Sequence, residues 1–158
     1  MYILNKKGFT LMELMVVVIL IGILSLIAMP YYKQHLEKEK SALGISSLRM
    51  FADSVERYMA LHNENVPTDL SLLDVDIDSN KLSGDKRTYS DGNFIYSVAT
   101  GSDGKHYIKG ARITGEYTLG YNVSNNDYDE ETGTLICISN GTNYCQDKLN
   151  MECASITL

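Results

Sequence analysis

Residues 6–30 read KKGFTLMELMVVVILIGILSLIAMP, and their apolar run continues to Tyr32. The segment from Phe9 to Tyr32 contains 24 residues, of which only Glu13 carries a charge. At about 1.5 Å per residue, a helix of this length crosses a bilayer core of about 30 Å. We therefore predict a membrane-spanning helix over residues 9–32. The two lysines before it favour a cytoplasmic N-terminus, with the rest of the chain across the membrane.

Two simpler interpretations of this segment leave features unexplained. A cleavable secretory signal has small residues at its cleavage site, and Ala28, Met29 and Pro30 fit that pattern poorly. A plain single-pass anchor explains the length and the orientation, but it gives no purpose to Glu13, whose carboxylate is costly inside hydrocarbon. A third interpretation gives this carboxylate a partner.

The partner would be a new α-amine. If the chain were cut between Gly8 and Phe9, the exposed amine, with an ordinary pKa near 8, would be a cation one helical turn before Glu13. Pairing within one helix would be strained, because the positive helix terminus already attracts Glu13. An incoming subunit whose amine meets the carboxylate of its neighbour would relieve the cost of the charge and fix the axial stagger. Glu13 is thus predicted to set the register of polymerisation.

Residues 8–18, GFTLMELMVVV, together with the apolar continuation to Pro30, resemble the leader and N-terminal helix of type IV pilins and type II secretion pseudopilins. The resemblance covers about residues 5–32. It implies the pilin fold, cleavage after Gly8 by a prepilin peptidase and methylation of the new N-terminus at Phe9. The glutamate of the family falls on Glu13, whereas Met12 replaces the usual isoleucine.

Gly22 and Pro30 mark the weakest part of the predicted membrane helix. Pro30 lacks an N–H group and clashes with the carbonyl of Leu26, and Gly22 lowers helix propensity by about 1 kcal/mol relative to alanine. The resemblance implies that this stretch unwinds in an assembled filament. An ordinary kinked membrane helix is the alternative interpretation.

Helical periodicity continues over residues 33–65, with apolar and polar side chains on opposite faces. The expected packing face includes Leu36, Leu43, Ser47, Leu48, Phe51, Val55, Tyr58, Met59 and His62, and the polar face Lys33, Glu37, Lys40, Arg49, Asp53, Glu56 and Arg57. The sequence VPTD at residues 66–69 predicts the helix end. One face of this half is expected to pack on a domain.

The remaining residues, 66–158, predict short strands separated by turns. Four strands are expected, at residues 93–99, 105–113, 116–123 and 134–139. The fold class is therefore α+β, with a small antiparallel sheet of about four strands against the second half of the helix. The expected organisation is a removed leader (1–8), a polymerisation helix (9–32), an amphipathic half (33–65) and a β domain (66–158).

Cys137, Cys145 and Cys153 all lie in the last 22 residues. Translocation would place them in an oxidising compartment, and the resemblance implies a disulfide that closes a C-terminal loop against the sheet. We favour a bond between Cys137 and Cys153, with Cys137 to Cys145 as the alternative. One thiol is left over.

Composition argues against several other functions. A net charge of −6 offers little for a nucleic-acid surface. The three histidines form no catalytic pattern with Ser, Cys or carboxylate residues. Asp74, Asp76 and Asp78 imitate the start of an EF-hand without its glycine or its final glutamate. A second acidic group comprises Asn125, Asp127, Asp129 and Glu130, and the resemblance to pseudopilins gives calcium binding there as an alternative. We expect no enzymatic activity, no cofactor and no bound metal.

The sequence predicts a type IV pilus subunit, inserted in the bacterial inner membrane and then assembled at the cell surface. Expected partners are identical or related pilins, the prepilin peptidase and an inner-membrane platform with its ATPase. A type II secretion pseudopilin in a periplasmic pseudopilus is the alternative within the family. A membrane-anchored extracytoplasmic binding domain is the alternative from another class, against which Gly8 and Glu13 argue.

Overall fold

The computed structural model describes residues 8–63, 65–123, 134–141 and 143–158. The chain divides into two compact units, residues 1–36 and 37–158. A single long helix, α1 (Leu11–Leu61), contributes to both. It is followed by the short helices η1 (Leu70–Leu72) and η2 (Ser79–Lys81), five strands and the single-turn π-helix η3 (Cys145–Leu149). The fold is α+β, as predicted.

Helix α1 ends at Leu61, a little before the expected boundary near residue 65. Asn63 has a φ of 53°, in the left-handed region that stops a helix. The side-chain amide of Asn65 donates a hydrogen bond to the carbonyl oxygen of His62 at 2.8 Å, which satisfies one of the carbonyl groups left at the helix end.

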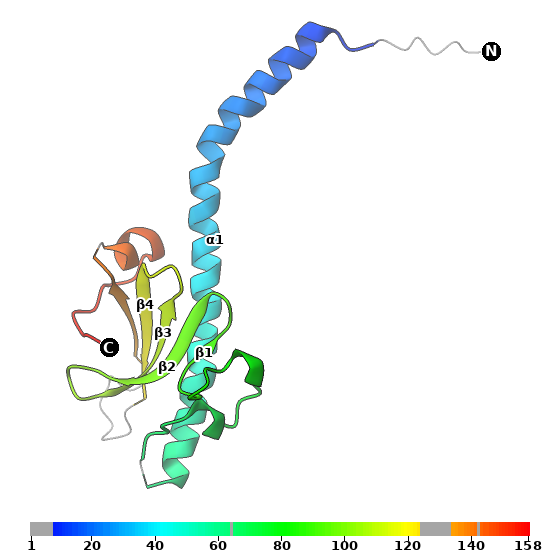
Figure 1. Ribbon diagram of the computed structural model, residues 1–158. Helices are drawn as coiled ribbons and strands as arrows, with labels where there is room; N and C mark the ends of the chain where they lie inside the picture. Colours follow the sequence, from blue (N-terminus) through cyan, green and yellow to red (C-terminus); the bar gives the residue numbers. More distant parts are fainter. Residues whose placement is uncertain (1–7, 64, 124–133, 142) are drawn as a thin grey trace. The chain divides into compact units, whose positions relative to one another are not determined.

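The sheet is antiparallel, with its strands in sequence order from β1 to β5 (Figure 1). Its members are β1 (Tyr89–Ser90), β2 (Phe94–Thr100), β3 (His106–Arg112), β4 (Tyr117–Asn122) and β5 (Leu135–Ser139). The four predicted strands are confirmed. The two-residue β1 was not predicted, because a segment this short carries no alternation of apolar and polar residues.

The core of the second unit lies between α1 and one face of the sheet. Leu48, Phe51 and Val55 of the helix are fully buried. Facing them are Tyr96 of β2 and Ile108 of β3, which are also fully buried. The predicted packing face is therefore confirmed at these helical positions and at Met59, which is 2% exposed. Because each layer alone would leave this apolar area in water, the two layers stabilise each other.

Three assignments on the helix were wrong. His62, expected on the packing face, is exposed and stacks on Tyr58 one turn before it. Leu43, expected on the packing face, is 66% exposed. Glu37, expected on the polar face, instead forms an ion pair with Arg112 of β3, whose side chain is only 5% exposed. Directly after Leu43 the helix approaches the sheet through Gly44, where an added Cβ would lie 2.8 Å from the Phe94 ring.

The disulfide joins Cys137 of β5 to Cys145 at the start of η3, with the two Cα atoms 6.0 Å apart. The favoured Cys137–Cys153 pairing is therefore wrong. Cys153 does lie beside Cys137 through an isolated β-bridge, but its side chain is exposed whereas the Cys137 side chain is fully buried. Neighbouring backbones are not enough for a disulfide, which also requires the two side chains to point toward each other.

Candidate assembly site on the N-terminal helix

The first unit presents an uncovered apolar helix. Every residue from Gly8 to Lys33 is exposed. Within the described residues, α1 is the one helix whose length and composition would allow it to cross a membrane. Large apolar side chains occur all around it, and Glu13 is the only charged side chain between Phe9 and Tyr32. Such a surface requires an apolar environment, either lipid or other apolar helices.

Glu13 and Thr10 form a reciprocal cap at the start of α1. The Glu13 N–H donates to Thr10 Oγ1 at 3.2 Å, and the Thr10 N–H donates to Glu13 Oε2 at 2.9 Å. The Thr10 hydroxyl also donates to the same carboxylate oxygen at 3.0 Å. This arrangement is a capping box, which satisfies two N–H groups that the first helical turn would otherwise leave without partners.

The sequence analysis missed this local function of Glu13, although the signal is in the sequence. Thr10 and Glu13 are spaced as the S/T-x-x-E pattern requires, immediately before an apolar helical run. The cap uses only one carboxylate oxygen. Oε1 of Glu13 accepts no hydrogen bond from the residues that the structure describes. One carboxylate can therefore cap its own helix and still accept a further donor.

Phe9 and Gly8, the residues on either side of the predicted cleavage, precede the helix and are exposed. In the described part of the chain, no hydrogen bond joins Phe9 to Glu13, and the nearest N–H to the carboxylate is that of Thr10. The uncut chain therefore satisfies Oε2 of Glu13 within its own first turn.

Gly22 and Pro30 both lie within continuous helix. The Ser25 hydroxyl donates to the Ile21 carbonyl oxygen at 2.8 Å, a back-bond that often accompanies helix bending. An added Cβ at Gly22 would meet no atom within 4 Å. The glycine is therefore not required by packing within the subunit, and its conformational freedom remains the property that distinguishes it from alanine.

The first acidic group has structural partners. Asp74 accepts hydrogen bonds from Arg57 Nε and Nη2, both at 2.8 Å, and a very short one from the Ser54 hydroxyl. The Arg57 and Ser54 hydrogen bonds lower the pKa of Asp74 to about 2. Asp78 caps η2 through the N–H of Asn80 at 3.0 Å. In the described ranges no three His, Cys, Asp or Glu side chains gather as a metal site, and Asn125, Asp127, Asp129 and Glu130 lie outside those ranges.

The family described as the prokaryotic N-terminal methylation motif matches residues 3–29. This chain carries that motif. The match includes Gly8, Phe9 and Glu13, so the predicted resemblance to type IV pilins and type II secretion pseudopilins is confirmed.

Curated proteins that match the chain come from both kinds of system. The type II secretion system core protein G of Aeromonas hydrophila is 30% identical over 91 residues, 58% of this chain and 63% of that protein. The fimbrial protein EcpB of Eikenella corrodens is 40% identical over 64 residues, 40% of this chain and 39% of that protein. The type IV major fimbrial protein FimA of Dichelobacter nodosus is 49% identical over 41 residues, 26% of each chain.

The matched part of the chain thus spans less than two thirds of each of these relatives. No solved structure matches the chain. The motif is therefore shared with secretion and fimbrial proteins alike.

Proposed function

We propose that this chain is a structural subunit of a type IV pilus. The observation that carries the proposal is the exposed apolar helix of the first unit, with Glu13 at its start and the methylation motif around it. The subunit would be inserted in the bacterial inner membrane, cleaved after Gly8 and methylated at Phe9. It would then polymerise through residues 9–32, which exchange lipid for the apolar helices of neighbouring subunits.

Assembly would be heterologous and open-ended, because each subunit offers an amine at one point and a carboxylate at another. The amine at Phe9 of an incoming subunit would approach Oε1 of Glu13 in its neighbour. The capping box supports this step, since it holds the Glu13 carboxylate at a fixed place on α1 while using only Oε2. A charge that finds an opposite charge in an apolar filament core is far less costly than an isolated one.

Two other components would act on the subunit. A prepilin peptidase would remove residues 1–8, and an inner-membrane platform with its ATPase would supply the energy for extraction from lipid. The amphipathic half, residues 33–65, and the β domain, residues 66–158, would form the filament exterior. The helix of each subunit would unwind between Gly22 and Pro30 in the assembled filament. The role is structural, with no reaction catalysed by this chain.

A pseudopilin of a type II secretion system is the second candidate. The similarity to core protein G favours it, because that match covers more of this chain than the matches to the fimbrial proteins EcpB and FimA do. Both candidates use the same helix and the same processing. They differ in the filament, which is a surface pilus in one case and a periplasmic pseudopilus in the other.

The decisive experiment compares Glu13→Gln with Glu13→Ala in cells that carry the matching assembly system. A glutamine at this position can keep the capping box but not the charge. We expect both variants to insert in the membrane and to be cleaved after Gly8, and both to lose filaments in electron micrographs. Ser46→Ala, on an exposed part of α1, serves as the control that should assemble normally.

Mass spectrometry of the mature N-terminus completes the test. We expect a chain that begins with N-methylated Phe9. Filaments built from chains that retain residues 1–8, or normal filaments from Glu13→Gln, would disprove the electrostatic mechanism. Filaments sheared from the cell surface support the pilus, and filaments confined to the periplasm support the pseudopilus.

A further inference from the structure

One edge of the sheet is only partly covered. β1 pairs with β2 at two positions, Tyr96 and Ile95. From Ser97 to Thr100, β2 pairs with β3 on its other side. Among the described residues, no strand lies along this end of β2 on the side of β1.

The backbone groups at this open edge can be assigned from the ladder between β2 and β3. The Gly101 N–H donates to the Lys105 oxygen at 2.8 Å, and the Ile113 N–H donates to the Asn93 oxygen at 3.0 Å. These bonds place the odd-numbered residues of β2 in hydrogen-bonded pairs with β3. Because the direction alternates along an antiparallel strand, Val98 and Thr100 direct their N–H and C=O groups to the open edge.

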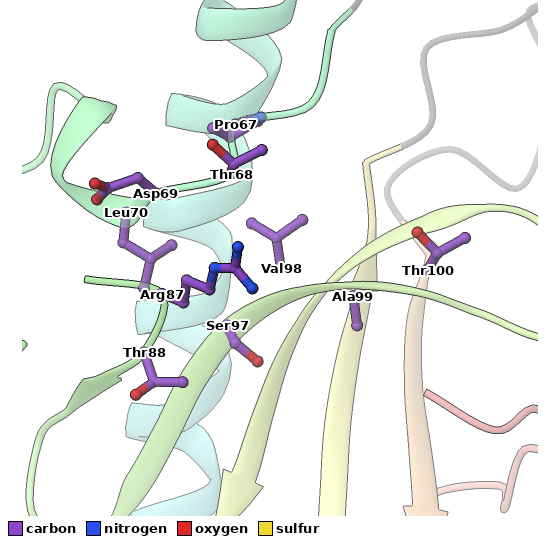
Figure 2. A pocket seen from close by; sticks show the side chains of 10 residues that line it. All are labelled: Pro67, Thr68, Asp69, Leu70, Arg87, Thr88, Ser97, Val98, Ala99 and Thr100. Atoms are coloured by element: carbon purple, nitrogen blue, oxygen red, sulfur yellow. The ribbon is translucent and has the colours of Figure 1, made fainter. Parts of the chain in front are cut away.

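A pocket of about 310 Å³ lies against this same edge, entirely within the second unit (Figure 2). Its walls are the segment from Pro67 to Leu70, the pair Arg87 and Thr88, and β2 from Ser97 to Thr100. Figure 2 shows the guanidinium group of Arg87 directed across the pocket toward β2. The carboxylate of Asp69 points away, and its Oδ1 accepts a hydrogen bond from the Ser71 N–H at 2.7 Å.

The Arg87 guanidinium has free hydrogen-bond donors, although its charge attracts the nearby carboxylate of Asp85. It donates no hydrogen bond to any residue that the structure describes, and the residue is exposed. The nearby carboxylate of Asp85 is used by the Arg87 backbone N–H at 3.2 Å and by the Ser83 hydroxyl at 2.5 Å. A planar guanidinium with free donors is suited to two-point pairing with a carboxylate.

We propose that this edge binds an extended acidic peptide segment of another protein, which adds a strand to β2 beside Tyr89 and pairs its carboxylate with Arg87. Main-chain hydrogen bonds to Val98 and Thr100 would provide affinity, and the arginine would select an acidic residue. An open strand edge beside a guanidinium whose hydrogen-bond donors are free argues for this occupant. A small carboxylate ligand would leave the backbone groups of the open edge without partners, and a neutral peptide would leave the Arg87 guanidinium without one.

The test uses the full chain in detergent micelles and a peptide labelled at its N-terminal amine, fluorescein-Thr-Val-Thr-Glu-Thr-Val-amide. Fluorescence anisotropy measures binding of this peptide and of its counterpart with Gln in place of Glu. Arg87→Gln removes the cation at an exposed position. Thr100→Pro removes one edge N–H and leaves the β3 ladder, to which this N–H does not contribute. Arg49→Gln, on an exposed part of α1, is the matched control.

We expect saturable binding of the Glu peptide, weakened at least about tenfold by Arg87→Gln, by Thr100→Pro and by the Gln peptide, and unchanged in Arg49→Gln. Unchanged circular dichroism of the free variants shows that each one folds. The proposal fails if the Glu peptide does not bind at millimolar concentration, if Arg87→Gln binds it equally, or if sodium acetate at equal concentration displaces it. This outcome is independent of filament assembly, which the first unit would govern.

Discussion

Arg112 and Glu37 form a two-point ion pair between β3 and α1. Arg112 Nε lies 2.6 Å from Glu37 Oε1, and Arg112 Nη2 lies 3.1 Å from Glu37 Oε2. The Tyr117 hydroxyl donates to the same Glu37 Oε1 at 3.1 Å. Arg112 Nη1 also donates to the Asn93 carbonyl oxygen at 2.6 Å. The pair therefore joins the helix to three segments of the sheet region through one carboxylate and one guanidinium.

Replacing Glu37 with alanine should lower the free energy of unfolding of the second unit by about 3–5 kcal/mol, since it leaves the buried Arg112 charge without its carboxylate partner. Thermal unfolding followed by circular dichroism checks the change. Glu37→Gln keeps one hydrogen-bond acceptor and should cost less. An unchanged thermal transition in Glu37→Ala would show that water hydrates the Arg112 guanidinium in place of the carboxylate.

The same pair should make stability depend on pH on the acid side. Burial alone would raise the pKa of Glu37, but the hydrogen bond and charge of Arg112 outweigh it and lower the pKa below its usual value. A lowered folded-state pKa means that the contribution is complete above the unfolded value of about 4.3 and is lost as pH falls below it. Urea unfolding should therefore show that the free energy of unfolding falls between pH 6 and pH 3. This fall should be smaller in Glu37→Gln, which has no carboxylate to titrate at this position.

Gly44 and Gly22 provide a matched pair of substitutions in one helix. A Cβ at position 44 would lie 2.8 Å and 2.9 Å from two ring carbons of Phe94, which is fully buried. Gly44→Ala should therefore destabilise the second unit by about 1–3 kcal/mol, despite the better helix propensity of alanine. The melting temperature of the second unit measures this effect.

Gly22→Ala is the control, because nothing within 4 Å opposes the added Cβ. It should leave the melting of the second unit unchanged and increase the helix propensity of the membrane segment. If Gly22 serves to let the filament helix unwind, this variant should still insert and be processed while its filaments become fewer or stiffer. Equal melting of the two variants would argue against close packing at Gly44.

The disulfide gives a prediction that chemical mapping can check. Peptides from the unreduced protein should contain Cys137 linked to Cys145, and Cys153 should be alkylated without reduction because it is exposed. Cys145→Ser should lower stability by about 2.5 kcal/mol, as the chain-entropy model gives for a loop this short. Cys153→Ser is the control and should unfold like the parent. A Cys137–Cys153 peptide would contradict the structure.

Arg57 should control the titration of Asp74. Its hydrogen bonds hold the pKa of that carboxyl at about 2, with help from Ser54. In Arg57→Gln, the carboxyl ¹³C resonance of Asp74 should titrate closer to the ordinary value of about 3.9. Arg49→Gln should leave the resonance where it was. A titration near 3.9 in the parent protein would show that the exposed pair does not persist in solution.

Substitutions at Thr10 test whether filament assembly requires the helix cap. Thr10→Ala removes the hydroxyl that accepts from the Glu13 N–H, whereas Thr10→Ser keeps it. Hydrogen exchange of the first turn of α1 should be faster in Thr10→Ala only. If the Glu13 charge serves assembly, the alanine variant should still form filaments. Loss of filaments in Thr10→Ala would mean that the cap itself is required.

Local sequence determined the elements of this protein. The uncharged run from Leu14 to Tyr32 predicts the membrane helix without reference to any other part of the chain. Alternation and turn residues predicted β2 to β5, because period-two patterning is a property of each strand alone. The spacing of Thr10 and Glu13 also specified the helix cap, since both partners lie within one turn.

Tertiary structure decided the features that depend on residues distant in sequence. Arg112 and Glu37 are 75 positions apart, and nothing local marks either as the partner of the other. The disulfide partner of Cys137 depended on side-chain direction, and the spacing of cysteines does not encode direction. The open edge beside Arg87 exists only because β1 stops after two residues. Periodicity reports which face of an element is apolar, whereas pairing depends on how the chain brings those faces together.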